Sequence, residues 1–491
     1  MLNFLFILCV LIWLPILLYQ MTSRSFAVVI IWFFIAPVAS NVVNNPGNNP
    51  IFHKSFDRAY APESQMDTLD ESRTGESLKD DNRIRLNQLL EPTRTLLWAI
   101  LAVFLLNALA KRIPLEPLDH TEIYMIVFSV ILLVVVFLKS SRLHWSLHMT
   151  IDAFMSPFLG YYIMRRLITS EERQRRLIQV LGYMGCYVIL IGLLERLLQP
   201  DLFYRVFGPF PTGSTLHVVM ATVFFVVLAE SFGSRGLPAR KWIFPRRIRW
   251  FVLCLIPVII LLTWSRGNWA GFCMGIAVFW FLGLRLFHIS WKIATFGLIL
   301  ILVPVIVVSV PIFVPMEMFD TRVGDTNTIY GRFATWLVAL QAGASHPLFG
   351  IGLDNLSQEV LVDTHLRFQG IGNFDSVHQS FLQIFAEQGV LGLLAYLAIL
   401  GSIFRKGLRL YRSGPEPQDR WRGIAVVAMM VAYLIPGFFA STLHVVAMLH
   451  HVFVYAYVGG IAGLYGRQFA TPRLYVVRRP SARRPQVPSH P

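Results

Sequence analysis

Long uninterrupted apolar runs, separated by short polar segments, make up most of the chain. Each run holds about 18 to 24 residues, which is enough for a helix to cross a hydrocarbon core of about 30 Å. Helices are the expected form because backbone groups in lipid need internal hydrogen-bond partners. We therefore predict an all-α, polytopic transmembrane helical bundle of about 12 to 13 spans. The expected spans cover residues 2–20, 25–42, 93–110, 121–138, 145–164, 177–195, 214–232, 250–264, 268–287, 291–314, 380–404, 422–440 and 445–465.

Whether the chain has 12 or 13 spans depends on the segment at 145–164, which contains the ionisable residues His148 and Asp152. Two long polar stretches then divide the chain into regions. The first begins with NNPGNNP and has no assigned chemistry, and the second is a large loop expected to contain short helices. The predicted regions are N-terminal spans (1–42), a polar insert (43–92), a main bundle (93–314), the large loop (315–379), C-terminal spans (380–466) and a basic, proline-rich tail (467–491).

Composition and charge support a membrane protein with one defined orientation. Only 14% of the residues are charged, far below the roughly 25% of a soluble domain. The net charge of +15 is concentrated in short loops, which indicates membrane orientation rather than nucleic-acid binding. The basic stretches at 165–176, 235–249, 405–412 and 476–484 should be cytoplasmic, and the large loop should then be periplasmic.

Neither cysteines nor histidines suggest a metal or redox site. The four cysteines lie in apolar runs without a CxxC pair, as expected of small buried hydrophobic residues: Cys9, Cys186, Cys254 and Cys273. A histidine cluster lacks carboxylate or cysteine at ligand spacing: His444, His450 and His451. We expect no metal and no cofactor.

Arg266 is the first candidate for chemistry, in the sequence TWSRGNW between two apolar runs. Arginine at a span end commonly serves as an interface anchor, but the positive-inside rule makes an anchor unexpected at an outer end. Gly267 would let a bulky anion approach the backbone, and the amides at the start of the next helix also favour an anion. Ser265, Arg266 and Gly267 are therefore predicted to bind an anionic group.

Arg332 is the second candidate, in an amphipathic stretch of the large loop predicted as a helix over 331–343. Trp336 lies four residues later, on the same face, where it would seat the helix in the headgroup layer or stack on a sugar ring. An ordinary surface helix with a solvated arginine is the alternative. Arg322 in the same loop is a weaker candidate for the same role.

His378 is the third candidate, where the large loop returns to the membrane. Histidine has an ordinary pKa near 6.5, so it can accept a proton from a hydroxyl at neutral pH. Gln379 beside it would orient the imidazole or bind a sugar hydroxyl. The alternative for His378 is a polar residue at a helix start.

The motifs around Arg266, Arg332 and His378 resemble those of the O-antigen ligase and polymerase superfamily, and the resemblance covers roughly residues 215–405. The run from His378 to Gly392 is similar to the family signature: histidine, then Asn, Ser or Gln, nine residues, glycine, two residues and glycine. The tripeptide at Arg266 resembles the first arginine motif of the family. Arg332 and Trp336, followed by HPLFGIG at 346–352, resemble its large periplasmic loop. The polar insert departs from the family pattern.

The resemblance implies a glycosyltransferase of the bacterial inner membrane that needs neither metal nor nucleotide. The expected donor is an undecaprenyl-diphosphate-linked glycan, and the expected acceptor is lipid A-core or a glycan; membrane lipids are the other partners, and nucleic acid is not one. Arg266 and Arg332 would clamp the diphosphate, and His378 would deprotonate the acceptor hydroxyl. Residues expected to bind substrate are Ser265, Gly267, Arg322, Trp336 and Gln379.

Two other functions stay open from the sequence. A repeat-unit polymerase needs the same donor site and the same activated hydroxyl, so its sequence would look alike. A transporter or flippase of the lipid-linked glycan would instead place polar groups near the membrane midplane in two related halves. No internal repeat is evident in the sequence, and the candidate residues are predicted at one interface.

Overall fold

A computed structural model describes residues 116–141, 143–198, 205–210, 213–234, 243–286, 327–353, 355–356, 377, 379–438 and 451–470, together with residues 26, 97, 98, 100, 102, 104 and 105. These residues are mostly helical and none of them lies in a strand. The predicted all-α fold is confirmed. The spans at 2–20 and 291–314 and the polar insert lie outside the described residues, and the span at 25–42 meets them only at residue 26. Of the predicted tail, residues 467–470 belong to α19 and the rest lies outside the described residues.

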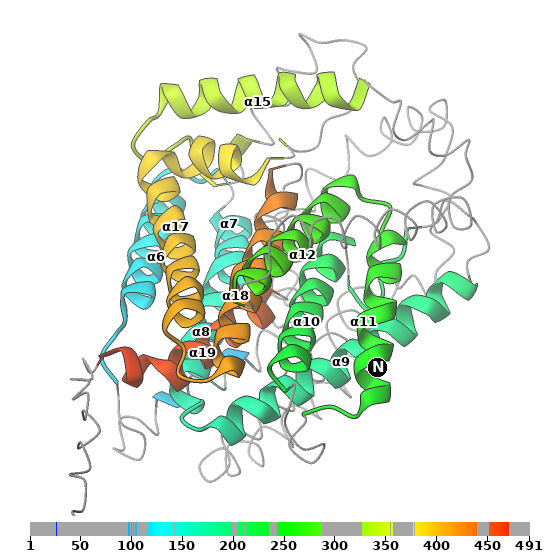
Figure 1. The fold of residues 1–491 in the computed structure, drawn as a ribbon. Coiled ribbons are helices and arrows are strands. Elements are labelled where there is room, and N and C mark those ends of the chain that lie inside the picture. The colour runs from blue at the N-terminus through cyan, green and yellow to red at the C-terminus, as the bar shows by residue number, and fades with distance from the viewer. Residues whose placement is uncertain are drawn as a thin grey trace, which may run out of the picture.

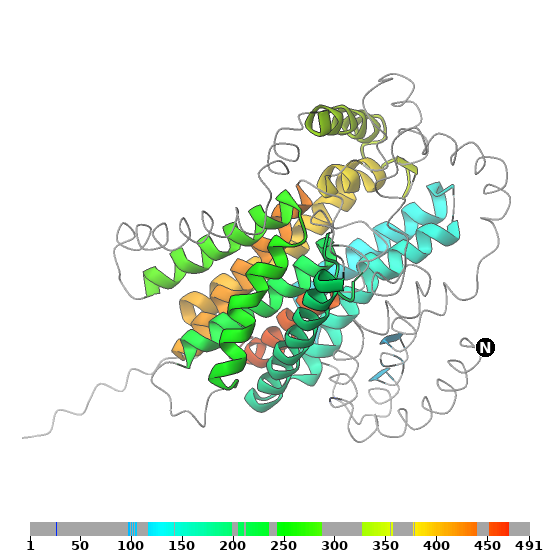
Figure 2. The ribbon, with the colours of Figure 1, turned by 90° about the vertical axis from the view of Figure 1, so that its right-hand side faces the viewer.

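Figure 1 shows a bundle of helices with one further helix, α15, lying across one end of it, and Figure 2 shows the same arrangement from the side. The helices, in chain order, are α6 (His120–Lys139), α7 (Leu143–Met149), the π-helix η2 (Thr150–Met155), α8 (Ser156–Leu167), α9 (Glu171–Leu198), α10 (Gly213–Gly233), α11 (Arg246–Leu261), α12 (Arg266–Leu286), α15 (Asn327–Ser345), α17 (Ser380–Ser413), α18 (Pro417–Gly437) and α19 (Val452–Ala470).

Five of the described helices are long and apolar enough to cross a membrane, namely α6, α9, α10, α12 and α17. They coincide closely with predicted spans, as α10 does with 214–232. The predicted span at 145–164 is also helical, but a π-helical turn joins α7 to α8 within it. There His148 pairs with Asp152 at 3.0 Å, so these two ionisable residues satisfy each other inside the helix.

Helix ends gather in two groups at opposite ends of the bundle. The α15 end contains the start of α12, where Asn268 donates to the carbonyl of Gly213 at 3.1 Å, and the contact between Phe381 of α17 and Phe438 beyond α18. The opposite end contains the basic segments 165–176 and 405–412. There the buried Arg422 joins several helices through carboxylates, pairing with Glu171 and Glu230 at 2.6 Å each.

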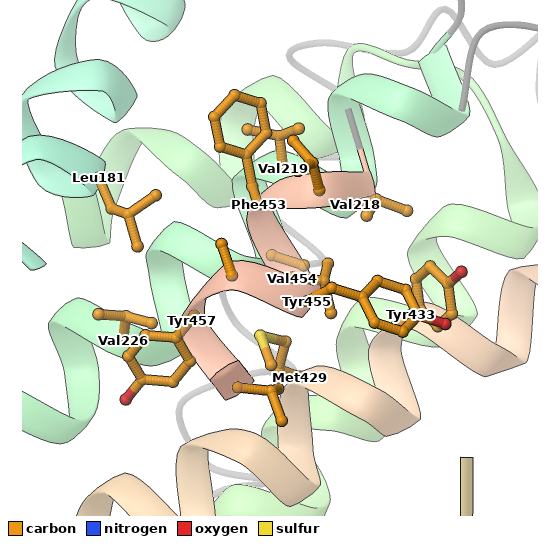
Figure 3. Close-up of a cluster of buried hydrophobic side chains, with 14 of the residues drawn as sticks. Leu181, Val218, Val219, Val226, Met429, Tyr433, Phe453, Val454, Tyr455 and Tyr457 are labelled. Carbon is orange, nitrogen blue, oxygen red and sulfur yellow. The ribbon is translucent and has the colours of Figure 1, made fainter. Parts of the chain in front are cut away.

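The core is built from apolar side chains of helices that pass one another closely. Figure 3 shows Phe453, Tyr455 and Tyr457 of α19 among valines of α10 and Met429 of α18. α18 packs against α10, α12 and α17, so it is central to the described bundle. A Cβ atom at Gly271 of α12 would crowd the carbonyl of Ala432, which is why a glycine is needed at that crossing.

Candidate functional site

α17 is broken at Gly389, and this break shapes the α15 end. Gly389 has φ +69° inside an otherwise helical stretch. The amides of Val390 and Leu391, which a continuous helix would use in its own ladder, donate instead to the carbonyls of Pro347 (2.8 Å) and Leu348 (3.4 Å). The predicted span at 380–404 is thus helical, with a break at Gly389.

The carbonyls left free by the same break are also satisfied by the HPLFGIG segment (346–352). Ile351 donates its backbone N–H to the carbonyl of Ala386 at 2.9 Å, and Gly352 donates to Glu387 at 3.1 Å. The segment thus replaces the helical bonds that Gly389 interrupts, and buried backbone groups stay paired. As a result the first segment of α17 (380–388) turns away from the rest of the helix and runs beneath α15, as Figure 1 shows in yellow.

Substituting Gly389 tests this arrangement. A Cβ atom there would overlap the carbonyl of Leu348, and φ +69° is unfavourable for other residues by about 1–2 kcal/mol. Gly389→Ala should therefore lower the thermal midpoint of the purified protein in detergent. Gly401→Ala is the matched control, because a Cβ at Gly401 of the same helix meets nothing within 4 Å. Equal midpoints for the two variants would contradict the proposed role of the break.

The chain is anchored on both sides of position 378, at Val377 by α15 and at Gln379 by the first turn of α17. The indole Nε1 of Trp336 donates to the carbonyl of Val377 at 3.0 Å, and the hydroxyl of Thr335 lies 3.4 Å from the same oxygen. Gln379 caps the start of α17, with its side-chain oxygen accepting from the amide of Leu382. Trp336 and Gln379 therefore position this segment, a role that the sequence did not suggest for either residue. His378 and Arg322 lie outside the described residues.

Arg266 lies in the first turn of α12. The carbonyl of Ser265 accepts from the amide of Trp269 at 3.0 Å, so Ser265 marks the boundary of the helix. The amides of Arg266 and Gly267 then belong to the N-terminal turn, where backbone N–H groups lack helical partners and the helix dipole favours an anion. Arg266 is exposed at this turn.

Arg266 and Arg332 lie close enough to influence each other. Burial and the charge of Arg266 both lower the pKa of the half-buried Arg332 guanidinium. Neither guanidinium group forms a hydrogen bond or an ion pair with any residue that the structure describes. Two neighbouring positive charges with no acidic partner among the described residues, one of them at a helix N-terminus, are an arrangement that favours an anion.

The structure adds residues that sequence patterns did not single out. Trp264, directly before the Arg266 turn, has φ +51°, a conformation that costs a bulky residue about 1–2 kcal/mol and that clusters at functional sites. Lys139 donates to the carbonyl of Gly350 at 2.7 Å, and Asn355 bonds to both α6 and the HPLFGIG segment. No sequence pattern indicated a role for Trp264. For Asn355, the nearby HPLFGIG motif indicated the region but not the residue.

One known family matches the part of the chain that contains these residues. Residues 250–397 match the family model described as O-antigen ligase. The match begins in α11, ends in α17, and contains Arg266, Arg332 and the break at Gly389. The resemblance found in the sequence is thereby confirmed over this segment. A search of curated proteins gives no match.

Proposed function

We propose, on the premise that residues 250–397 match the O-antigen ligase family model, that the chain transfers a glycan from undecaprenyl diphosphate to an acceptor hydroxyl. The proposed acceptor is the lipid A-core. The basic segments 165–176 and 405–412 lie at the opposite end of the bundle from α15, and the positive-inside rule then supports a periplasmic position for the α15 end in the bacterial inner membrane.

The observation that carries this proposal is the pair of guanidinium groups at Arg266 and Arg332. A lipid-linked diphosphate gains negative charge as the sugar departs, and fixed donors aimed at that charge lower the barrier. Guanidinium groups suit this task because they remain charged and bind phosphate oxygens in pairs. The mutual repulsion of the two arginines is relieved when the diphosphate binds between them, so the free site is prepared for an anion.

His378 is the proposed general base. Its sequence neighbours Val377 and Gln379 are fixed by α15 and by the α17 cap, respectively. The imidazole takes the proton of the acceptor hydroxyl and later releases it to water. The hydroxyl oxygen forms a bond to the anomeric carbon, the bond to the diphosphate oxygen breaks, and its electron pair leaves with the diphosphate. Attack opposite the leaving group inverts the anomeric centre.

The remaining predicted residues have supporting roles in this proposal. Ser265 and Gly267 shape the turn beside the diphosphate, and Trp336 and Gln379 hold the segment that carries His378. Arg322 remains a further candidate for phosphate contact.

Purified protein with lipid-linked glycan and lipid A-core, without ATP, tests the proposal directly. Because guanidinium groups perform the charge stabilisation, transfer should continue at an unchanged rate in EDTA. Product is detected as glycan-bearing acceptor on gels and by mass spectrometry. Absence of transfer to any acceptor, or loss of transfer in EDTA that added Mg²⁺ restores, would refute the proposed mechanism.

The alternatives give different products in the same assay. A polymerase would extend the lipid-linked glycan without lipid A-core, yielding longer chains on the carrier. A flippase would move the donor across vesicles without forming a glycosidic bond. The arginine pair at one end of the bundle favours transfer over transport, because a transport path is expected to place polar groups near the midplane.

A further inference from the structure

The side chain of Asn355 has a complete set of hydrogen bonds, to the end of α6 and to the HPLFGIG segment. Its buried amide nitrogen donates to the carbonyls of Lys139 (2.8 Å) and Ile351 (2.9 Å). Its amide oxygen accepts from both the backbone N–H (3.2 Å) and the hydroxyl (2.6 Å) of Ser141. An asparagine side chain offers two donors and two acceptor sites, so every one of them is used here. Such a residue fixes the relative placement of its partners closely.

The end of α6 is attached to the HPLFGIG segment at further points. Lys139 donates its ammonium to the carbonyl of Gly350 at 2.7 Å, and the hydroxyl of Ser146 donates to the carbonyl of Leu353 at 3.1 Å. A Cβ atom at Gly352 would meet the amide of Asn355 and the carbonyl of Lys139, so the backbone approaches closely. We call this set of contacts between 139–146 and 350–355 the α6 clasp.

We propose that the α6 clasp, with Asn355 at its centre, is a positioning device for glycan transfer. The clasp fixes Ile351 and Gly352, whose amides bind the free carbonyls at the α17 break. The break sets the direction of the first segment of α17, and that segment leads to Val377 and the indole of Trp336 on α15. A continuous set of contacts therefore runs from α6 to the helix that carries Arg332. This inference rests on the proposed function.

The clasp is not required merely to hold α6 against α17. The two helices pack along their length, and a second polar tie joins them at the opposite end, where the hydroxyl of Ser402 donates to that of Thr121 at 2.9 Å. Lys406 of α17 also pairs with Asp119 before α6 at 3.3 Å. The clasp instead acts on residues 380–388, through the bonds of Ile351 and Gly352 to Ala386 and Glu387. Its loss should therefore affect the geometry of the reaction more than the association of the helices.

Asn355→Ala tests the proposal in purified full-length protein, with kcat and the donor KM measured separately. A misplacement of about 1 Å can lower a rate about 100-fold, so kcat should fall between about 10-fold and 100-fold. The donor KM should change less than kcat does, because Arg266 on α12 lies outside the clasp and continues to bind the diphosphate. Ser402→Ala, which removes the tie at the other end of the same helices, should leave kcat unchanged.

A coupled variant separates the clasp from a general packing defect. Ser141→Ala removes one donor to Asn355 and should lower kcat less than Asn355→Ala does. The double variant should be no slower than Asn355→Ala alone, because both changes act through one network. Multiplicative effects in the double variant would contradict the clasp.

Other outcomes are equally decisive. A normal kcat for Asn355→Ala, or an equal loss in Ser402→Ala, would overturn the positioning role. A lowered kcat accompanied by a proportional loss of folded protein, measured by thermal midpoint and monodisperse yield, would reduce Asn355 to a structural residue. Failure of the proposed function is distinguishable, because wild-type protein would then form no product and His378→Ala would not differ from it.

Discussion

His378→Ala should reduce glycan transfer by at least about 100-fold, the usual contribution of a positioned general base. The proposed role of the imidazole is to remove the proton of the acceptor hydroxyl, and alanine has no group for this task. Donor binding should persist, because the diphosphate is held by Arg266 and Arg332 rather than by the base. Initial rates at saturating donor, together with binding of labelled donor, check both parts.

His346→Ala is the matched control for the base. His346 is an exposed histidine at the same end of the bundle, and its Nδ1 lies 3.0 Å from the hydroxyl of Ser345. Its replacement should leave transfer close to the wild-type rate. Near-normal transfer by His378→Ala, or an equal loss in both histidine variants, would remove the assignment of His378 as base.

Helix positions could be predicted well from the sequence because apolar length alone fixes a span. The predicted spans at 121–138 and 268–287 match α6 and α12 to within a few residues. α15 is longer than the predicted 331–343, since it covers Asn327–Ser345. The helix does not begin at Gly331 but continues through it, because a glycine destabilises a helix by only about 1 kcal/mol, which is small beside tertiary packing.

The sequence could also predict that Arg266 and Arg332 lie at the same end of the bundle. Loop charges fix which ends of the spans share a side of the membrane, so two residues far apart in the chain could be assigned to one end. The electrostatic influence of Arg266 on Arg332 agrees with that expectation. Membrane orientation assigns each residue to one side of the membrane, whereas the distance between two residues follows from helix packing.

The break in α17 could not be predicted, because 380–404 is long and apolar enough to cross the membrane as one helix. Gly389 alone is compatible with an unbroken helix, and the break is stable only because Pro347 and Leu348 accept the released amides. Those partners are remote in sequence and have no hydropathy signal of their own. The clasp at Asn355 escaped prediction for the same reason, since its bonds depend on the placement of α6.

Arg266→Lys should lower kcat/KM for transfer by about 100-fold, comparable to the loss of one donor to a developing negative charge. Lysine keeps the positive charge but presents a single ammonium, so it cannot bind two phosphate oxygens in a fixed plane. The loss should appear mainly in kcat, because charge on the diphosphate grows in the transition state.

Arg285→Lys provides the comparison for that variant on the same helix. Arg285 lies at the other end of α12, with its guanidinium 4.4 Å from the centre of the Phe281 ring, and should tolerate lysine without loss of transfer. Arg332→Lys should resemble Arg266→Lys, and the double variant should lose less than the product of the two, because both guanidinium groups act on one diphosphate. Full activity of Arg266→Lys would leave Arg266 as a point charge or an interface anchor, and the paired clamp would have to be abandoned.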